Sequence, residues 1–412
     1  MKRNLLIIAA AALVLVGCAN DDLRNDIQDE QVGIGFSTFT GKLTRSENSN
    51  VTAKYALEGY HTNFKVWSSK YIAKGTNPET YDEKTVFNAQ EVNHQDADNT
   101  VDPAITEGWV YSPISFWDKS ATKYDFYAAA PASEAWSWDN TNKKLSLDNF
   151  SVTGTTIDAS SSVSATAVFG AKDLMISEDI TDHADYTGAK VNLHFIHILS
   201  RLNIGVAKAT PLLDDYIVKL KSIKVFNMNS NGKFNEGQAT ANSNPGNNSR
   251  WIAPTEGQKT FTTGVGYTTE TVVESTMNYV YQALAIPQTV AYEAGIKLDG
   301  TNATTTSKPY LNIVYEIWTK DVKYASTDPE VVAGTQTTDD VKVASYKIDD
   351  YNYTYNLADM FNGSNAVTSV NFNEGWMNTL KITINPAAIE FDADVYEWAP
   401  VTPVDVNVPQ AN

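Results

Sequence analysis

One residue near the start of the chain is placed for a specific covalent modification. Cys18 is the only cysteine among the 412 residues. The small apolar residues 15–17 precede it directly, after a basic start at Lys2 and Arg3 and an apolar run over residues 5–16. This order is typical of a bacterial lipoprotein signal, whose removal leaves a cysteine that acyl chains can modify. The chemistry that the sequence predicts here is lipidation of the new N-terminus.

Such a lipid would anchor the chain without a membrane-spanning helix. The apolar run is too short to remain as a transmembrane segment, whereas each buried CH₂ of an acyl chain contributes roughly 0.8 kcal/mol. We therefore predict a signal peptide over residues 1–17, acyl chains on Cys18, and a flexible acidic tether over residues 18–31. The alternative is an ordinary secretory signal followed by an incidental cysteine.

The histidines are the next residues that could ligate a metal or exchange protons. His194 and His197 are three positions apart in a predicted strand. Because side chains alternate between the faces of a strand, this spacing places the two rings on opposite sides. A shared metal is therefore not expected, and we interpret both as structural. The remaining histidines are His61, His94 and His183.

Acidic and aromatic groups give no stronger signal for catalysis. The acidic stretch 394–397 is better explained as the solvent face of an edge strand than as a catalytic pair. Residues 96–99 and 339–340 supply oxygen ligands, but neither matches a complete calcium loop. Trp136 and Trp138 could stack on a sugar, although tryptophan more often fills a core. We therefore predict no enzyme, no metal site and no cofactor.

The elements that would hold these residues are short strands. Val32, Ile34 and Phe36 alternate with small residues and begin the first of them. Residues 191–206 read as one long strand with a bulge near Ser200. Further strand candidates cover residues 64–67, 109–111, 124–129, 145–152, 218–226, 311–318, 351–355, 380–384 and 389–395. Many short strands separated by turn residues predict an all-β fold of antiparallel β-sandwiches.

Length, composition and charge limit the class of protein further. A chain of this length normally divides into two domains, and we expect them at residues 32–188 and 189–398, with a tail over residues 399–412. The formal net charge of −18 argues against binding to nucleic acid or to anionic membrane surfaces. Aromatic residues make up 11% and charged residues 19%, which favours β-structure with polar loops.

Three segments resemble one known family. Residues 114–117 (ISFW) and 124–131 (YDFYAAAP) resemble the "FW … YDFYAYYP" region of the fimbrillins of Bacteroidota, the subunits of type V pili. Residues 193–202 (LHFIHILSRL) resemble their "L-x-F-x-H-x-L-[SA]-x-L" strand. Residues 389–398 (IEFDADVYEW) resemble their closing "I-x-F-x-A-x-V-x-x-W" pattern.

The resemblance implies a fold, a location and a maturation step. Fimbrillins have two transthyretin-like β-sandwich domains in tandem and are found at the outer membrane or in the fimbria. They are exported as lipoproteins and then cut after an arginine near the start of the first domain. Arg45, which precedes Ser46, stands where that cut would fall, and the nearby Arg24 and Lys42 are the alternative positions. Residues 32–45 would then be a propeptide strand, and the partners would be other pilus subunits.

A cut at this position would permit exchange of strands between subunits. Removing the first strand would leave unpaired backbone groups and uncovered apolar residues, which can accept a strand from another chain. In the tail, Val404, Val406 and Val408 alternate with polar residues at the same spacing as the first strand. We interpret them as a candidate donor strand. The alternative is a disordered polar tail.

Two other functions fit the same observations. The chain could be a lipidated anchor or tip subunit of the same pilus. It could also be a glycan-binding surface lipoprotein of the outer membrane. In each case a receptor on a host or bacterial surface is a possible partner.

Overall fold

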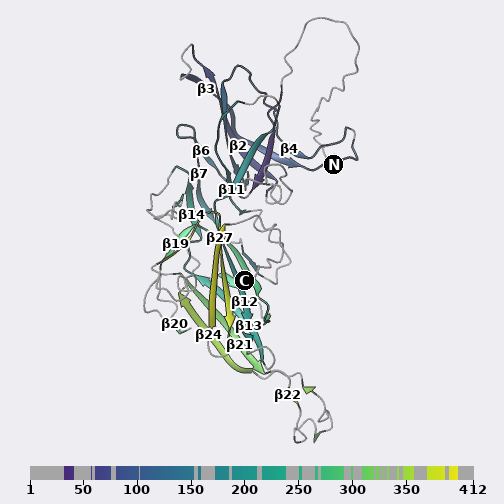
Figure 1. Cartoon of the computed structure of the whole chain (residues 1–412), viewed down its shortest axis with the longest axis vertical. Coiled ribbons are helices and arrows are strands. Elements are labelled where there is room, and N and C mark those ends of the chain that lie inside the picture. Colours follow the sequence, from purple (N-terminus) through teal and green to yellow (C-terminus); the bar gives the residue numbers. More distant parts are fainter. Residues whose placement is uncertain are drawn as a thin grey trace, which may run out of the picture.

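Strands form the regular structure throughout the part of the chain that the computed structural model describes. These are residues 32–40, 57, 61–75, 80–101, 103–152, 156–158, 172–184, 188–210, 216–237, 250–252, 265–267, 271–291, 298–299, 309–319, 322–323, 327, 332–333, 341–342, 347–356, 369–385 and 389–397. No helix within these residues is long and apolar enough to cross a membrane. The molecule is elongated, with early strands near one end and later strands near the other (Figure 1).

The first sheet has eight strands and comes from the first half of the chain. In spatial order they are β1 (Phe36–Thr40), β11 (Val191–His197), β9 (Met175–Ser177), β5 (Lys123–Ala130), β2 (Asn63–Ala73), β3 (Tyr81–Gln95) and β4 (Gly108–Val110), and β10 (Ile180–His183) pairs with β5. Its pairs are antiparallel except β1 and β11, which run parallel. The sheet buries a core that includes Phe64, Val66 and Phe126.

The two ends of this first sheet approach each other. Trp109 Nε1, in β4, donates a hydrogen bond to Thr38 Oγ1, in β1, at 3.0 Å. Just before β1, Gly33 forms an isolated antiparallel bridge with Phe116. The sheet therefore curls around its core, and residues 32–40 lie where its ends meet.

A four-stranded sheet lies next along the molecule and joins segments that are distant in sequence (Figure 1). Its strands, in order, are β15 (Trp251–Ile252), β14 (Asn231–Asn235), β7 (Lys144–Ser151) and β6 (Ser137–Asp139). Its side chains share a core with residues of the first sheet, among them Trp67 and Tyr127.

Two larger sheets form the other end of the molecule. The five-stranded sheet consists of β27 (Ile389–Glu397), β26 (Trp376–Ile384), β12 (Ser200–Lys208), β18 (Asn278–Ala285) and β8 (Thr156–Asp158). The six-stranded sheet consists of β16 (Val265–Tyr267), β13 (Tyr216–Phe226), β21 (Tyr310–Thr319), β24 (Lys347–Asn356), β20 (Leu298–Asp299) and β17 (Thr271–Val273). Two small pairs complete the described strands: β19 (Gln288–Ala291) with β25 (Ser369–Phe372), and β22 (Val322–Lys323) with β23 (Val341–Lys342).

These two larger sheets pack on a common core. Alternate residues of β12 and β13, such as Ile204 and Leu220, meet there and are fully buried. The prediction of an all-β, β-sandwich fold is confirmed. Its strands are not all antiparallel, however, because β1–β11 and β12–β26 are parallel pairs.

The predicted long strand over residues 191–206 is wrong. The chain leaves the first sheet after β11 and enters the five-stranded sheet at β12, with Ile198 and Leu199 between them. Both linking residues are fully buried, and Ile198 N donates to Leu174 O at 3.0 Å. The change of sheet thus falls after the expected boundary at 188/189. Pairing also crosses that boundary, because β8 pairs with β18.

Candidate functional site

The first strand and the residues before it occupy the place where the ends of the first sheet meet. Ile34 is 2% exposed and Phe36 is 1% exposed, and Val32 packs against the same core while half-buried. The alternation read from the sequence therefore places all three side chains towards the interior.

The backbone of this segment is held from two sides. Before β1, Ile34 N donates to Ser115 O, and Trp117 N donates to Val32 O, both at 2.9 Å. From Phe36 onward the segment pairs in parallel with β11 instead. Parallel pairing is slightly weaker per residue than antiparallel pairing. The segment is thus an edge strand that closes the sheet.

The side chain of Phe36 fills an aromatic cage. Four rings have centroids between 5.7 and 6.2 Å from its own: Phe64, Phe87, Tyr111 and Phe126. Full burial of such a side chain stabilises a fold by roughly 1.5–3 kcal/mol, and each favourable ring pair adds about 0.5–1.5 kcal/mol. Phe36 is therefore the residue whose loss would expose the most apolar surface in this segment.

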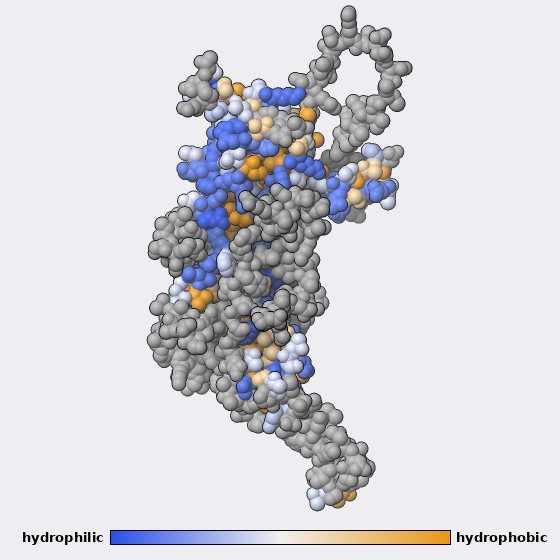
Figure 2. All heavy atoms as spheres, in the orientation of Figure 1, coloured by the Kyte–Doolittle hydropathy of each residue, from blue (hydrophilic) through white to orange (hydrophobic). Residues whose placement is uncertain are grey.

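Polar groups of residues 109–115 complete the site. The Tyr111 hydroxyl donates to Ile34 O at 2.7 Å, and it lies 3.3 Å from Ser115 O. Burial raises the pKa of Tyr111 to about 12, so its hydroxyl keeps its proton and donates at physiological pH. Around this edge some apolar side chains remain in solvent, since Ile114 is 58% exposed and Phe116 is 46% exposed. On the face in Figure 2, hydrophilic residues cover much of the upper left of the described surface, and several hydrophobic patches interrupt them.

Together these contacts define a groove that one strand occupies. If residues 32–40 left, the backbone of β11 would lose its partner on one side while keeping β9 on the other, and the cage around Phe36 would open to water. An unpaired edge beside an apolar groove is the arrangement that accepts an extended segment by β-augmentation. The geometry would therefore let another extended segment take the place of residues 32–40 through non-covalent contacts.

The other predicted site residues lie outside the described part of the chain. These are Cys18, Arg45, Ser46, Val404, Val406 and Val408. The calcium-type stretch 96–99 is described, and there the Asp98 carboxylate accepts hydrogen bonds from Thr100 N at 2.8 Å and Thr100 Oγ1 at 2.6 Å. Within the described ranges, no group of three or more histidine, cysteine or acidic side chains could hold a metal ion.

The two histidines of β11 face opposite sides, as their spacing predicts. His197 is buried, and its Nδ1 lies 2.7 Å from Asp173 Oδ2. His194 is half-buried, and its Nδ1 lies 2.9 Å from Glu178 Oε2. Each ring thus has its own acidic partner and a structural role in joining β11 to the segment around β9.

Sequence reasoning missed the opposite wall of the groove. The sequence predicts a strand over residues 109–111 and a family motif over residues 114–117, but no local pattern connects either segment with Phe36. The available signal was the concentration of aromatic residues, Trp109, Tyr111 and Phe116, in a short stretch between turns. No local pattern shows that this stretch lies against a strand more than seventy residues earlier.

Comparison with known proteins places the chain among pilus-related sequences. A family model described as fimbrillin-like matches residues 44–398. No curated protein matches the chain. The chain is similar to a fimbrial protein from Bacteroides vulgatus, with 15% identity, a TM-score of 0.49, and coverage of 89% of this chain and 99% of that one. It is also similar to a fimbrial assembly protein from Parabacteroides distasonis, with 12% identity, a TM-score of 0.31, and coverage of 89% and 100%. Because both TM-scores are below 0.5, the assignment of the chain to a family rests on the family model.

Proposed function

Because the chain belongs to the fimbrillin-like family, we propose that it is a structural subunit of a surface pilus that supports adhesion. In this proposal the chain is exported as a lipoprotein, delivered to the outer membrane, and cut after Arg45. It then assembles with other subunits by exchange of strands.

One structural observation supports the proposed assembly by strand exchange. The edge strand that closes the first sheet ends at Thr40, five residues before Arg45. A cut after Arg45 would therefore separate Ile34 and Phe36 from the rest of the fold. Because both side chains are fully buried, their release would leave an apolar groove beside β11, whose edge away from β9 would be unpaired. The family match also begins at residue 44, so it covers the chain from about the expected cut onward.

The tail supplies the strand that would fill this groove in the next subunit. Val404, Val406 and Val408 have the same alternation as the residues that leave. Pro403 and Pro409 flank them and cannot donate backbone hydrogen bonds, which disfavours this segment as an interior strand of its own sheet. Three aliphatic side chains and a row of backbone groups could then replace the lost contacts.

Replacing Cys18 by alanine tests the export step. Without a thiol, no thioether-linked lipid can form, so Cys18→Ala should abolish incorporation of labelled palmitate and leave the signal peptide uncleaved. The measurement is palmitate labelling of the protein recovered from membranes, with the wild-type chain as the control. Labelled lipid on the variant would show that another residue carries it.

Replacing Arg45 by alanine tests the maturation step. We expect the Arg45→Ala chain to be exported and folded but to remain monomeric, because its own first strand still fills the groove. The measurement is electron microscopy of cells together with a gel of unboiled samples, in which fibres give a ladder. Arg24→Ala is the matched control, because it removes an arginine in the tether and should leave fibres intact. Normal fibres from the Arg45→Ala chain would contradict cleavage at this residue.

A further inference from the structure

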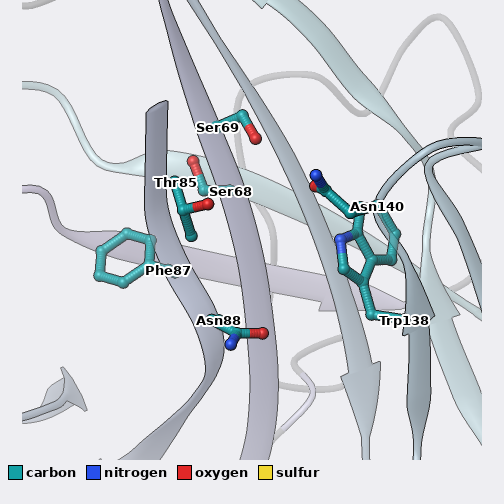
Figure 3. Close-up of a pocket in the computed structure, with 7 residues that line it drawn as sticks. All are labelled: Ser68, Ser69, Thr85, Phe87, Asn88, Trp138 and Asn140. Atoms are coloured by element: carbon teal, nitrogen blue, oxygen red, sulfur yellow. The ribbon is translucent and has the colours of Figure 1, made fainter. Parts of the chain in front are cut away.

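A small cavity lies between the first sheet and the β6–β7 hairpin, and the proposed assembly makes no use of it. Its volume is about 210 Å³. Figure 3 shows the side chains that line it: Ser68, Ser69, Thr85, Phe87, Asn88, Trp138 and Asn140. At about 30 Å³ for each molecule of liquid water, this space suits one small polar molecule of the size of a monosaccharide.

The chemistry of the lining selects a neutral, hydroxyl-rich ligand. Serine and threonine hydroxyls both donate and accept hydrogen bonds, and the asparagine amides offer two donors and an acceptor each. An indole adds an apolar ring face and one N–H donor. A pyranose has the matching character, because it carries hydroxyls around its rim and C–H groups on its faces. None of the lining side chains carries a charge, so an ionic ligand would find no direct partner among them.

The aromatic wall of the cavity is fixed by packing. The Trp138 ring lies 6.0 Å from Trp67 in a nearly parallel arrangement and 4.7 Å from Tyr127, centroid to centroid. Trp136, two residues earlier, belongs to the core and is only 7% exposed, and its Nε1 donates to Pro131 O at 3.0 Å. Of the two tryptophans that the sequence singles out, only Trp138 borders the cavity.

The polar wall is held in place by an ion pair outside the lining. Lys143 Nζ donates to Asn140 Oδ1 at 2.9 Å and also pairs with Glu83. Glu83 Oε1 in turn accepts a hydrogen bond from Ser69 Oγ at 2.7 Å. Figure 3 shows Asn140 and Trp138 side by side, reaching towards β2, with Ser69 opposite them. Groups that are positioned before the ligand arrives lose less freedom on binding.

The backbone beneath the cavity departs from regular pairing. The register of β2 and β3 shifts on both sides of Ser68. In β3, Ala89 has a φ of 55°, a left-handed conformation that alanine rarely adopts. Ser68 Oγ is also buried without a hydrogen-bond partner in the described structure. Bulges, strained residues and unsatisfied polar groups concentrate at binding sites, and here all three coincide within one short stretch.

We propose that this cavity binds a single neutral pyranose unit of a surface glycan. Trp138 forms the apolar wall, Asn140 and Asn88 supply amide donors and acceptors, and the hydroxyls of Ser69 and Thr85 complete the polar contacts. Sugar recognition would then lie between the first sheet and the β6–β7 hairpin, on residues that stay in the chain after a cut at Arg45.

Titration of the full-length protein with simple sugars tests this proposal. The probes are the methyl glycosides of glucose, galactose, mannose, fucose, N-acetylglucosamine and N-acetylgalactosamine. Binding is followed by saturation-transfer NMR and by tryptophan fluorescence. We expect saturable binding of at least one glycoside. Asn140→Ala should weaken it about tenfold, the effect of losing one good hydrogen bond, and Thr85→Val should weaken it in the same direction.

Both substitutions are at exposed positions, so the fold should tolerate them. Thr181→Val, at an exposed threonine of β10 that does not line the cavity, is the matched control and should bind as the wild type does. Trp138→Ala should remove binding altogether, with circular dichroism to check its fold. Binding of none of the six glycosides would overturn the proposal, as would binding that Asn140→Ala and Thr85→Val leave unchanged.

Discussion

Val406→Asp is expected to leave the monomer folded and to stop its assembly into fibres. In the proposed exchange, Val406 is the middle of three aliphatic side chains that enter the groove of the next subunit. Each such side chain contributes about 1.5–3 kcal/mol on burial, and each backbone hydrogen bond contributes about 0.5–1.5 kcal/mol. A carboxylate at the middle position would be buried without a partner, at a cost of several kcal/mol. The measurement is electron microscopy of the fibres together with the ladder of unboiled samples.

The matched control for this change lies one residue earlier. Asp405 alternates with the valines and should face away from the groove, so Asp405→Asn should leave assembly intact. If Val406→Asp forms fibres as readily as the wild type, the tail is not the donor strand. If Asp405→Asn stops assembly as well, the pattern of alternating side chains is not what the groove recognises.

Phe36→Ala is expected to destabilise the uncut protein and to have no effect on finished fibres. Truncating a buried phenylalanine costs about 3–5 kcal/mol, because it removes apolar contacts and leaves a cavity. Phe36 is 1% exposed among four aromatic rings. If the cut after Arg45 removes it, the assembled protein no longer contains this residue. The measurement is urea unfolding of the full-length chain, held uncut by Arg45→Ala, beside urea dissociation of fibres made without that change.

A second buried phenylalanine separates this explanation from a general loss of packing. Phe126 is fully buried in β5, contacts Phe36 directly, and would stay in the protein after cleavage. Phe126→Ala should therefore weaken both the uncut chain and the fibres. A fibre that Phe36→Ala weakens as much as Phe126→Ala does would mean that the first strand is retained on assembly.

Local patterns in the sequence predict part of the fold and part of the candidate site. Alternation places Ile34 and Phe36 inward, and odd spacing places His194 and His197 on opposite faces, because both inferences depend only on the period of a strand. The same reasoning joined β11 and β12 into one strand. Ile198 and Leu199 are apolar and fully buried, and a buried link between two sheets has the same composition as a continuous strand.

The walls of the two sites depend on contacts between distant segments. The parallel pairing of β1 with β11 joins residues that are about 155 positions apart, and no turn residue or local period indicates it. Trp136 and Trp138 are equally good candidates for sugar contact in the sequence. Only the packing of the β6–β7 hairpin on the first sheet places one in the core and the other beside a cavity.

Sequencing the N-terminus of the subunit recovered from purified fibres tests the central claim most directly. Cleavage and strand exchange predict that the sequence begins at Ser46, since only a chain without its first strand has an open groove. A fibre subunit that begins at Cys18, with its amine blocked by lipid and residues 32–40 still attached, would contradict the account.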